Sequence, residues 1–484
     1  MAGKQTPAQT KAMWNRIKAS QPSGISAVSG GNTPTTLFSS GGVGSTVAGF
    51  MGTPALTTMA LVNKETAGYV KNGLLNLGED TLSSNKSLAQ WREHFPRAKH
   101  LNVSGRRLTD ADFVYFNGLE SLNISRCRGF TDAAFVHLRG IKQLNITRCR
   151  HLTDAAFSHL SGIHTLIMEG CDQAGITDAG FANLRGIHTL VMNHCWNLGY
   201  NPEYQSGITG AALSHLVGIH TLHIKGCFQF SDADFVHLKG IKELNIESTN
   251  IGDAAFEYLE GIHSLSISQS GGHITGAGFV HLKGIHTLSM PEFYAFPEHE
   301  FAHLRGIKVL SIHGGSFTDI ALSYLEGIHT LEIGRNFGIT DAGIAHLKGI
   351  HTLLMPYCSQ ETITDAIFTH LKGIHHLDIN SCYQPTLTGA NLASLGCNLE
   401  TLKVTFCNQT LIDNARRLYG VMPNYTTNTH TPDGHRVKKF PLECSKKPGR
   451  LGFTLPSIGL PPSGGRTRKQ RDKGRKARKT KKRR

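Results

Sequence analysis

The sequence predicts an α/β solenoid: a curved parallel sheet of about fourteen short strands, short helices on its convex side, and disordered tails at both ends. Two observations lead to this fold class. The phrase Leu-x-Gly-Ile-(His or Lys)-x-Leu-x-(Ile or Met) recurs through the middle of the chain, and its glycines lie 21 to 24 residues apart, with one interval of 32. Each copy holds one strand-like and one helix-like segment that cannot bury an apolar face alone, so the copies must stack.

Each copy is interpreted as a strand followed by a helix. In one copy, Leu144 and Ile146 alternate with polar residues, which is typical of a strand buried on one face. Thr153 or its neighbouring aspartate can then cap a short helix, whose Phe157 and Leu160 lie three residues apart on one side. The glycine that follows ends this helix.

Composition shifts divide the chain of 484 residues into five parts. These are a flexible, partly Gly- and Ser-rich N-terminal region (1–46), a short apolar segment (47–97), the repeat array (98–407), a C-terminal cap (408–447) and a disordered basic tail (448–484).

The net charge of +15 is concentrated in the tail. Residues 466–484 hold thirteen Lys or Arg and one Asp, which leaves 37 basic against 34 acidic residues for the rest of the chain. Such a tail is compatible with nuclear targeting, with non-specific nucleic-acid contact or with a merely solvated end. No apolar stretch reaches the roughly 18 to 20 residues of a membrane helix, so we expect no membrane span.

Eight of the ten cysteines occupy one register, five residues after the strand leucine. We expect small, slightly polar side chains that fill the inner corner of each copy and meet backbone groups. A zinc site is the weaker interpretation, because the chain has no CxxC pair, and no metal is predicted. The N-terminus lacks the apolar block of a secretion signal, so we expect reduced thiols and an intracellular location, in the cytoplasm or nucleus.

The amino-acid sequence of the copies resembles that of a known class of repeat. Cys171 followed by Ile-Thr-Asp-Ala-Gly-Phe-Ala-Asn-Leu at 176–184 is similar to the cysteine-containing subclass of leucine-rich repeats. That subclass is best known from F-box proteins, the substrate-recruiting subunits of ubiquitin ligases, and the resemblance covers residues 98–407. It implies a leucine-rich-repeat solenoid and a role in binding a protein substrate.

The segment before the array resembles the second half of a degenerate F-box, which would dock a ubiquitin-ligase adaptor. The resemblance assigns adaptor binding to Phe50, Leu56, Leu61 and Val62. The alternative is that residues 47–96 only cap the exposed end of the solenoid.

The concave face is the predicted recognition surface, where a protein ligand is expected to bind. Fourteen strands at about 4.8 Å each give a face about 65 Å long, which suits a protein or extended peptide. Arg126, Arg128, Arg148 and Arg150 fall on adjacent copies just past the strands, and they predict a basic patch for an acidic partner.

The copy of 32 residues supplies a second group of candidates. Its long loop carries three aromatic residues, and exposed aromatic side chains are common anchors of protein interfaces. The alternative is that these aromatic rings pack against the repeat itself and only cover the additional residues of the loop. Around this loop, the predicted partner-binding residues are Glu169, His194, Trp196, Tyr200, Tyr204, Lys225 and Phe228.

Histidine recurs in two rows. One row follows the Gly-Ile pair (positions 164, 188, 220, 263, 286, 329, 351 and 375), and the other lies in the helices. The rows could bind metal or sense pH, but polar positions copied with the repeat explain them more simply. Protonation of adjacent copies should still cause repulsion, so stability is predicted to fall below about pH 6.

No single non-repeated grouping of nucleophile and base stands out, so we expect a protein that is not an enzyme and needs no cofactor. The sequence favours a protein-binding scaffold, which the resemblance extends to substrate recognition in a ubiquitin ligase. The alternatives are a leucine-rich-repeat interaction protein with no ubiquitin link and a nuclear protein that contacts nucleic acid through residues 466–484.

Overall fold

The computed structural model describes residues 88–195, 207–268, 274–291, 297–314 and 317–420. The predicted tails, the F-box-like residues Phe50 to Val62 and most of the predicted C-terminal cap therefore lie outside the described residues.

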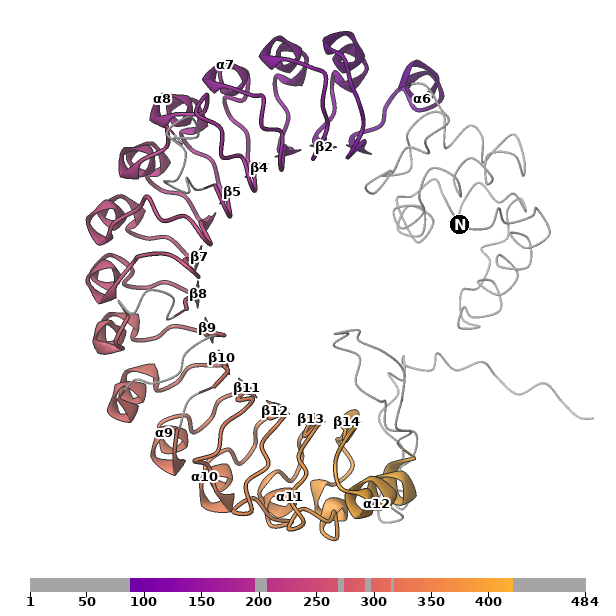
Figure 1. Cartoon of the computed structure of the whole chain (residues 1–484), viewed down its shortest axis with the longest axis vertical. Helices are drawn as coiled ribbons and strands as arrows, with labels where there is room; N and C mark the ends of the chain where they lie inside the picture. The colour runs from indigo at the N-terminus through magenta and orange to yellow at the C-terminus, as the bar shows by residue number, and fades with distance from the viewer. Residues whose placement is uncertain (1–87, 196–206, 269–273, 292–296, 315–316, 421–484) are drawn as a thin grey trace, which may run out of the picture. The chain divides into compact units, whose positions relative to one another are not determined.

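Fourteen strands form one parallel sheet in chain order, as predicted. Figure 1 shows the strands along the inner side of a curved array and the helices along its outer side. The strands are β1 (His100–Asn102), β2 (Ser121–Asn123), β3 (Gln143–Asn145), β4 (Thr165–Ile167), β5 (Thr189–Val191), β6 (Thr221–His223), β7 (Glu243–Asn245), β8 (Ser264–Ser266), β9 (Thr287–Met290), β10 (Val309–Ile312), β11 (Thr330–Glu332), β12 (Thr352–Leu354), β13 (His376–Asp378) and β14 (Thr401–Lys403).

The convex side carries one short helical segment in most copies, and more of these segments are 3-10 than α-helical. The α-helices are α6 (Leu88–His94), α7 (Asp154–Phe157), α8 (Asp178–Phe181), α9 (Asp319–Ser323), α10 (Asp341–Ala345), α11 (Ile367–His370) and α12 (Gln409–Tyr419). The 3-10 helices are η1 (Asp110–Phe116), η2 (Asp132–Leu138), η3 (Ala182–Leu184), η5 (Gly210–Leu216), η6 (Asp232–Leu238), η7 (Asp253–Tyr258), η8 (Ala277–Leu282), η9 (Glu298–Leu304) and η10 (Leu392–Leu395). Segments of one or two turns favour the tighter 3-10 form. Among the described helices, none is long and apolar enough to cross a membrane.

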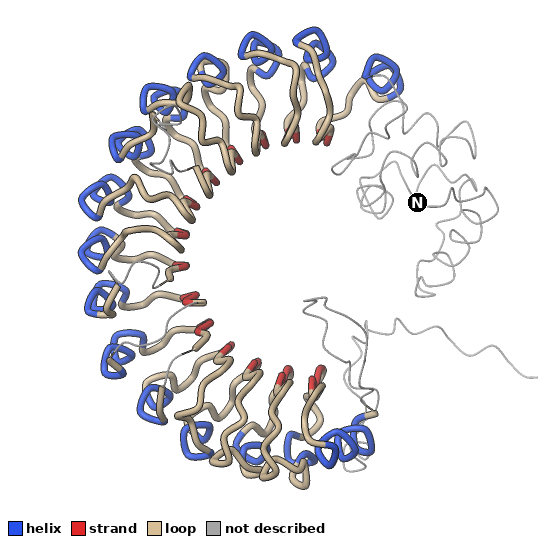
Figure 2. The backbone as a smooth tube through the Cα atoms, in the orientation of Figure 1, coloured by secondary structure: helices blue, strands red, loops and turns tan. Residues whose placement is uncertain are grey.

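The core lies between the strands and the helices shown in Figure 2. The central leucine of each strand pairs with its counterpart in the next, as in Leu122 with Leu144, so the leucines form one buried column. From the helix side, fully buried rings such as Phe135, Phe157 and Phe181 pack against that column. This arrangement matches the alternation and the three-residue helix spacing seen in the sequence.

Hydrogen bonds that a threonine donates to an aspartate carboxylate join the helix starts of adjacent repeats. Thr177 donates its backbone N–H to Asp154 Oδ1 at 2.8 Å and its hydroxyl to Asp154 Oδ2 at 2.6 Å. We call this arrangement the Asp–Thr clamp. Thr177 also accepts a hydrogen bond from Ala179 N, so it caps its own helix as predicted. The same clamp joins Thr131 to Asp110, Thr153 to Asp132, Thr209 to Asp178, Thr275 to Asp253, Thr340 to Asp319 and Thr364 to Asp341.

The cysteine register has the packing role expected from the sequence. Each of its eight thiols is buried and donates to the strand-end carbonyl of the preceding repeat, as Cys149 Sγ does to Ile124 O at 3.2 Å and Cys195 Sγ to Met168 O at 2.9 Å. Burial raises the pKa of the Cys149 and Cys171 thiols to about 12, which keeps them protonated. Cys397 is disulfide-bonded, so the expectation of ten reduced thiols was wrong for this residue.

Helices also cover the two ends of the array. Trp91 of α6 is fully buried against the first repeat. In α12, Leu411 and Tyr419 are buried, and the Tyr419 hydroxyl donates to Leu392 O at 2.8 Å. The apolar end faces of the solenoid are therefore shielded within the described part of the chain.

Candidate functional site: the turns after the strands

Wherever the structure describes the turn that follows a strand, this turn places one residue in the left-handed backbone region. Gly105 and Gly170 hold this position in two repeats, with φ of 74° and 60°. Arg126, Arg148 and His194 hold it in others, with φ of 58°, 59° and 57°. We call it the turn register. A side chain there costs about 1 to 2 kcal/mol relative to glycine, so a large residue in this register is a candidate for function.

The structure brings the four predicted arginines together. Arg126, Arg128, Arg148 and Arg150 line one cavity of about 660 Å³, with Cys127 and His151 completing the lining. Arg126 and Arg148 come from the turn register of adjacent repeats, and Arg128 and Arg150 follow two residues later. All four arginines are exposed to solvent. We call this group the arginine patch.

The patch keeps most of its positive charge. Arg150 pairs with Asp172, with Nε 2.9 Å from Oδ1 and Nη2 3.1 Å from Oδ2. No carboxylate of the described chain lies within 4 Å of the other three guanidinium groups. Burial lowers the pKa of His151, against the weaker influence of nearby aspartates, so this ring is neutral near pH 7. Three unpaired cations in one cavity favour a ligand with several negative charges.

The first repeat extends this basic surface in a way that the sequence interpretation missed. Arg106 and Arg107 directly follow Gly105, which occupies the turn register. Arg107 lies over Gly129, where an added Cβ would approach its Cγ to 3.2 Å. Aligning the first, degenerate copy on its turn would have revealed these two arginines.

The remaining predicted contact residues lie in the next repeats, where Glu169 borders the arginine patch and accepts a backbone hydrogen bond from Arg148 N at 2.9 Å. Glu169 accepts a hydrogen bond from Asn193 at 2.9 Å, and Lys225 pairs with Glu247 at 2.6 Å. Glu169 therefore already has a hydrogen-bond partner, and Lys225 an ion-pair partner, within the scaffold. His194 holds the turn register and Phe228 is 41% exposed. Trp196, Tyr200 and Tyr204 lie outside the described residues.

A second group of candidate contact residues lies on the last repeats. Phe337, Tyr357, Tyr383 and Phe406 are 51 to 64% exposed. Tyr357 and Phe406 stand in the turn register, with φ of 63° and 55°. The guanidinium of Arg335 lies 5.4 Å from the centre of the Tyr357 ring. The sequence analysis missed this group because its aromatic residues occupy two different positions of the turn: Tyr357 and Phe406 stand in the turn register, and Phe337 and Tyr383 stand two residues after it.

The residue directly after the central leucine of each strand differs between copies, and some members of this row have a structural role. The side-chain oxygens of Asn123 and Asn145 each accept a hydrogen bond from the backbone N–H two residues later, at 2.9 Å. Asn245 and Asp378 do the same at 3.0 Å. These residues shape the turn that presents the candidate site, so variation in the row is not all available for recognition.

The histidines after the Gly-Ile pair form stacks along the array. The rings of His164, His188 and His220 follow one another at 4.5 and 4.4 Å. Those of His263 and His286 lie 4.5 Å apart, and those of His329, His351 and His375 lie 4.5 and 4.2 Å apart. We call this row the histidine ladder. Among the described residues, no group of three potential ligands could hold a metal ion.

The ladder is expected to make stability depend on pH. Burial, followed by repulsion from His375, His329 and His376, lowers the pKa of His351, and Glu400 opposes this only weakly. Below the ordinary histidine pKa of about 6.5, the unfolded chain therefore binds more protons than the folded chain at this residue. The contribution of His351 to folding stability is therefore complete above about pH 6.5 and is lost as the pH falls toward the lowered pKa of this residue.

We expect the melting temperature to fall between pH 7.5 and 5.5, and to fall less in a His351→Gln variant. His313 opposes this trend, because its hydrogen bond with Glu332 raises its pKa and so favours folding at low pH. His159→Gln, in the turn that directly follows α7 on the outer side, serves as the control. Equal shifts for the wild type and His351→Gln would contradict the role given to the ladder.

The stacked strands, the cysteine register and the turn sites define a leucine-rich-repeat solenoid with exposed binding candidates. Among solved structures, the TLR13–ssRNA13 complex is similar with a TM-score of 0.47 and 15% identity, over 71% of this chain and 61% of that one. The Toll–Spatzle complex of Drosophila gives 0.45 and 13%, over 72% and 52%. The chain thus spans about half to three fifths of their lengths, and at these identities the likeness concerns the fold alone. No protein-family model and no curated protein sequence matches the chain.

Proposed function

We propose that this protein is a non-enzymatic binding scaffold whose protein partner presents an acidic segment to the arginine patch. One observation carries the proposal: Arg126, Arg128 and Arg148 line one cavity and have no carboxylate partner in the part of the chain that the structure describes. Two of them also take the left-handed backbone that glycine holds in neighbouring repeats. These two residues thus lower the stability of the fold, and no carboxylate neutralises their positive charges. Such a cost in stability is typical of residues retained for binding.

The substitution Arg148→Gly separates binding from folding. Glycine suits the left-handed backbone, so stability should be unchanged or raised by up to about 1 kcal/mol. Loss of one charge-assisted contact should weaken binding of a fluorescent octaglutamate peptide about tenfold, which corresponds to about 1.4 kcal/mol. Fluorescence anisotropy measures the affinity, and urea unfolding measures the stability.

Arg185→Ala is the matched control, because Arg185 is an exposed arginine at the end of the outer helix η3. It should leave peptide affinity unchanged. Raising the salt from 0.05 to 0.5 M should weaken binding to the wild type, since exposed charges are screened. Equal peptide affinities for the wild type and Arg148→Gly would rule out the patch as an acidic-peptide site.

The F-box resemblance supports a second candidate, in which the scaffold recruits its partner to a ubiquitin ligase. We propose that Phe50, Leu56, Leu61 and Val62 would then contact the adaptor. The test is capture of the purified adaptor by the full chain and by a Leu56→Ala/Leu61→Ala variant. Retention that the double substitution abolishes supports the link, and no retention by the wild type removes it, leaving an interaction protein without a ligase role.

The basic run at 466–484 supports a third candidate, non-specific contact with nucleic acid in the nucleus. Deletion of these residues should then abolish both nuclear accumulation and salt-sensitive binding to duplex DNA. If location and DNA binding stay unchanged, this candidate fails and a solvated tail is favoured.

A further inference from the structure

The histidine ladder has two gaps where lysine takes the register between two histidines. Lys242 lies between His220 and His263, and Lys308 lies between His286 and His329. Each lysine turns its ammonium group away from the ring position. Lys242 Nζ donates to Gly261 O at 3.1 Å, and Lys308 Nζ donates to Gly327 O at 3.2 Å.

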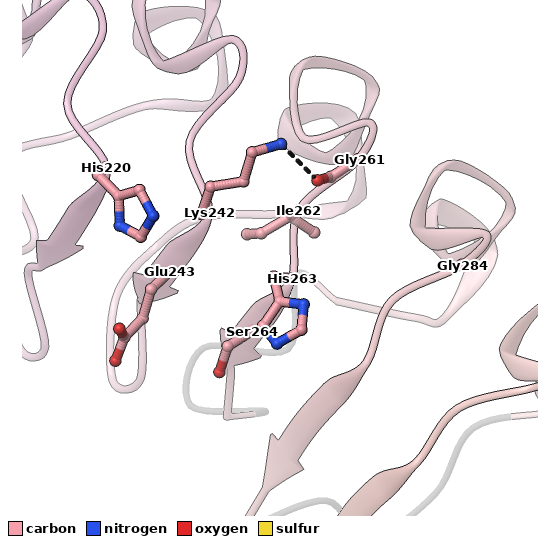
Figure 3. Close-up of a pocket in the computed structure, with 8 residues that line it drawn as sticks. All are labelled: His220, Lys242, Glu243, Gly261, Ile262, His263, Ser264 and Gly284. Atoms are coloured by element: carbon pink, nitrogen blue, oxygen red, sulfur yellow. Dashed lines mark hydrogen bonds between the residues drawn. The ribbon is translucent and has the colours of Figure 1, made fainter.

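The first gap opens into a cavity of about 560 Å³, lined by His220, Lys242, Glu243, His263 and Ser264 among others. Figure 3 shows His220 and His263 on opposite sides of the Lys242 position, with the lysine side chain extended toward Gly261. The two imidazoles therefore border a space from which the intervening side chain has bent away.

The spacing of this gap fits one planar group. Neighbouring rings in the ladder lie 4.4 Å apart at His188–His220 and 4.5 Å apart at His263–His286. His220 and His263 are two repeats apart, so their rings are separated by about twice the spacing of the ladder. A flat group halfway between them would contact both rings at ordinary stacking distance.

The edge of the gap determines which planar group suits it. At six of the eight histidine positions, the inner ring nitrogen faces a threonine hydroxyl, as in His220 Nδ1 and Thr221 Oγ1 at 3.1 Å. In the gap, Glu243 stands where the threonine would be. Its carboxylate lies 3.3 Å from His223 Nε2 and is 47% exposed, so it can accept further hydrogen bonds. A flat cation with several N–H donors satisfies both the rings and the carboxylate.

We propose that the gap between His220 and His263 binds a guanidinium group, stacked between the two imidazoles and hydrogen-bonded to Glu243. The group belongs either to an arginine side chain of a partner protein or to a small guanidino compound. This site is separate from the arginine patch, so it does not depend on the acidic-partner proposal.

The second gap provides an internal comparison. Lys308 has the same register and the same hydrogen bond to a glycine carbonyl, but the residue after it is Val309. Without a carboxylate at its edge, this gap lacks the acceptor for a guanidinium group. The proposal therefore assigns binding to the first gap and not to the second.

The test measures binding of two probes to the full chain by saturation-transfer NMR titration: methylguanidinium and the peptide acetyl-Gly-Arg-Gly-amide. Lys242→His fills the gap with the residue that eight other copies carry there, and Glu243→Val converts its edge to that of the second gap. Each substitution should raise the dissociation constant at least tenfold. Lys308→His, the matched control, should change it less than twofold.

A citrulline peptide of the same length tests the charge, because citrulline keeps the planar shape and loses the positive charge. It should bind at least tenfold more weakly than the arginine peptide. Tighter binding of the arginine peptide than of methylguanidinium assigns the site to a protein partner, and the reverse assigns it to a small compound. Affinities unaffected by Lys242→His in a variant with wild-type circular dichroism, or equal affinities for arginine and citrulline peptides, would overturn the proposal.

Discussion

Phe135→Ala is expected to lower the free energy of unfolding by about 3 to 5 kcal/mol. The Phe135 side chain has no exposed surface, and its ring lies 6.2 Å from that of Phe113 and 6.4 Å from that of Phe130. Truncation leaves a cavity between two adjacent repeats, because the neighbouring backbones are held by the sheet and cannot collapse into it. Urea unfolding followed by circular dichroism measures the loss.

Val136→Ala is the matched control for this substitution. Val136 is the next residue of η2, but it is 42% exposed. Its truncation should change stability by no more than about 0.5 kcal/mol. Similar losses at positions 135 and 136 would mean that the helix faces are assigned wrongly.

Asp154→Ala is expected to cost about 3 kcal/mol. The substitution removes both hydrogen bonds of one Asp–Thr clamp and leaves the Thr177 N–H without its acceptor at a partly buried helix start. Alanine cannot replace either bond.

A double-substitution cycle tests whether the clamp acts as a unit. Thr177→Val removes the hydroxyl bond alone, so it should cost less than Asp154→Ala. The two substitutions together should cost less than the sum of the single losses, because they remove a shared interaction. Strict additivity would show that Asp154 stabilises the array by some other contact.

The sheet could be predicted from the sequence because each strand repeats one burial pattern. Leu144 and its counterparts in the other copies fix both the strand and its parallel register. The 3-10 form of most helices could not be predicted, since the same apolar spacing suits one turn of either helix. The clamps were also missed: the Thr-Asp pair that many copies carry is explained equally well by capping within a copy, and only the structure shows Asp154 reaching Thr177.

The arginine patch could be anticipated because equal positions in adjacent copies must be neighbours. The sequence could not predict which of these charges form ion pairs, because pairing depends on the direction in which each side chain points. Arg150 meets Asp172, and Lys225 meets Glu247, in pairs that link different repeats. The histidine row was visible in the sequence, but the opening at Lys242 depends on where the lysine ammonium group turns, and no pattern of residues indicates that.

The Asp–Thr clamp has a consequence for how the array changes over evolutionary time. Every clamp joins one repeat to the next, as do the cysteine–carbonyl hydrogen bonds and the pairing of strand leucines. A duplication or deletion that begins and ends at equivalent positions therefore recreates the same junction with all three contacts, where the joined repeats carry the aspartate, the threonine and the cysteine. Between such repeats, unequal recombination within the gene can lengthen or shorten this solenoid by whole units without a compensating mutation at the new junction.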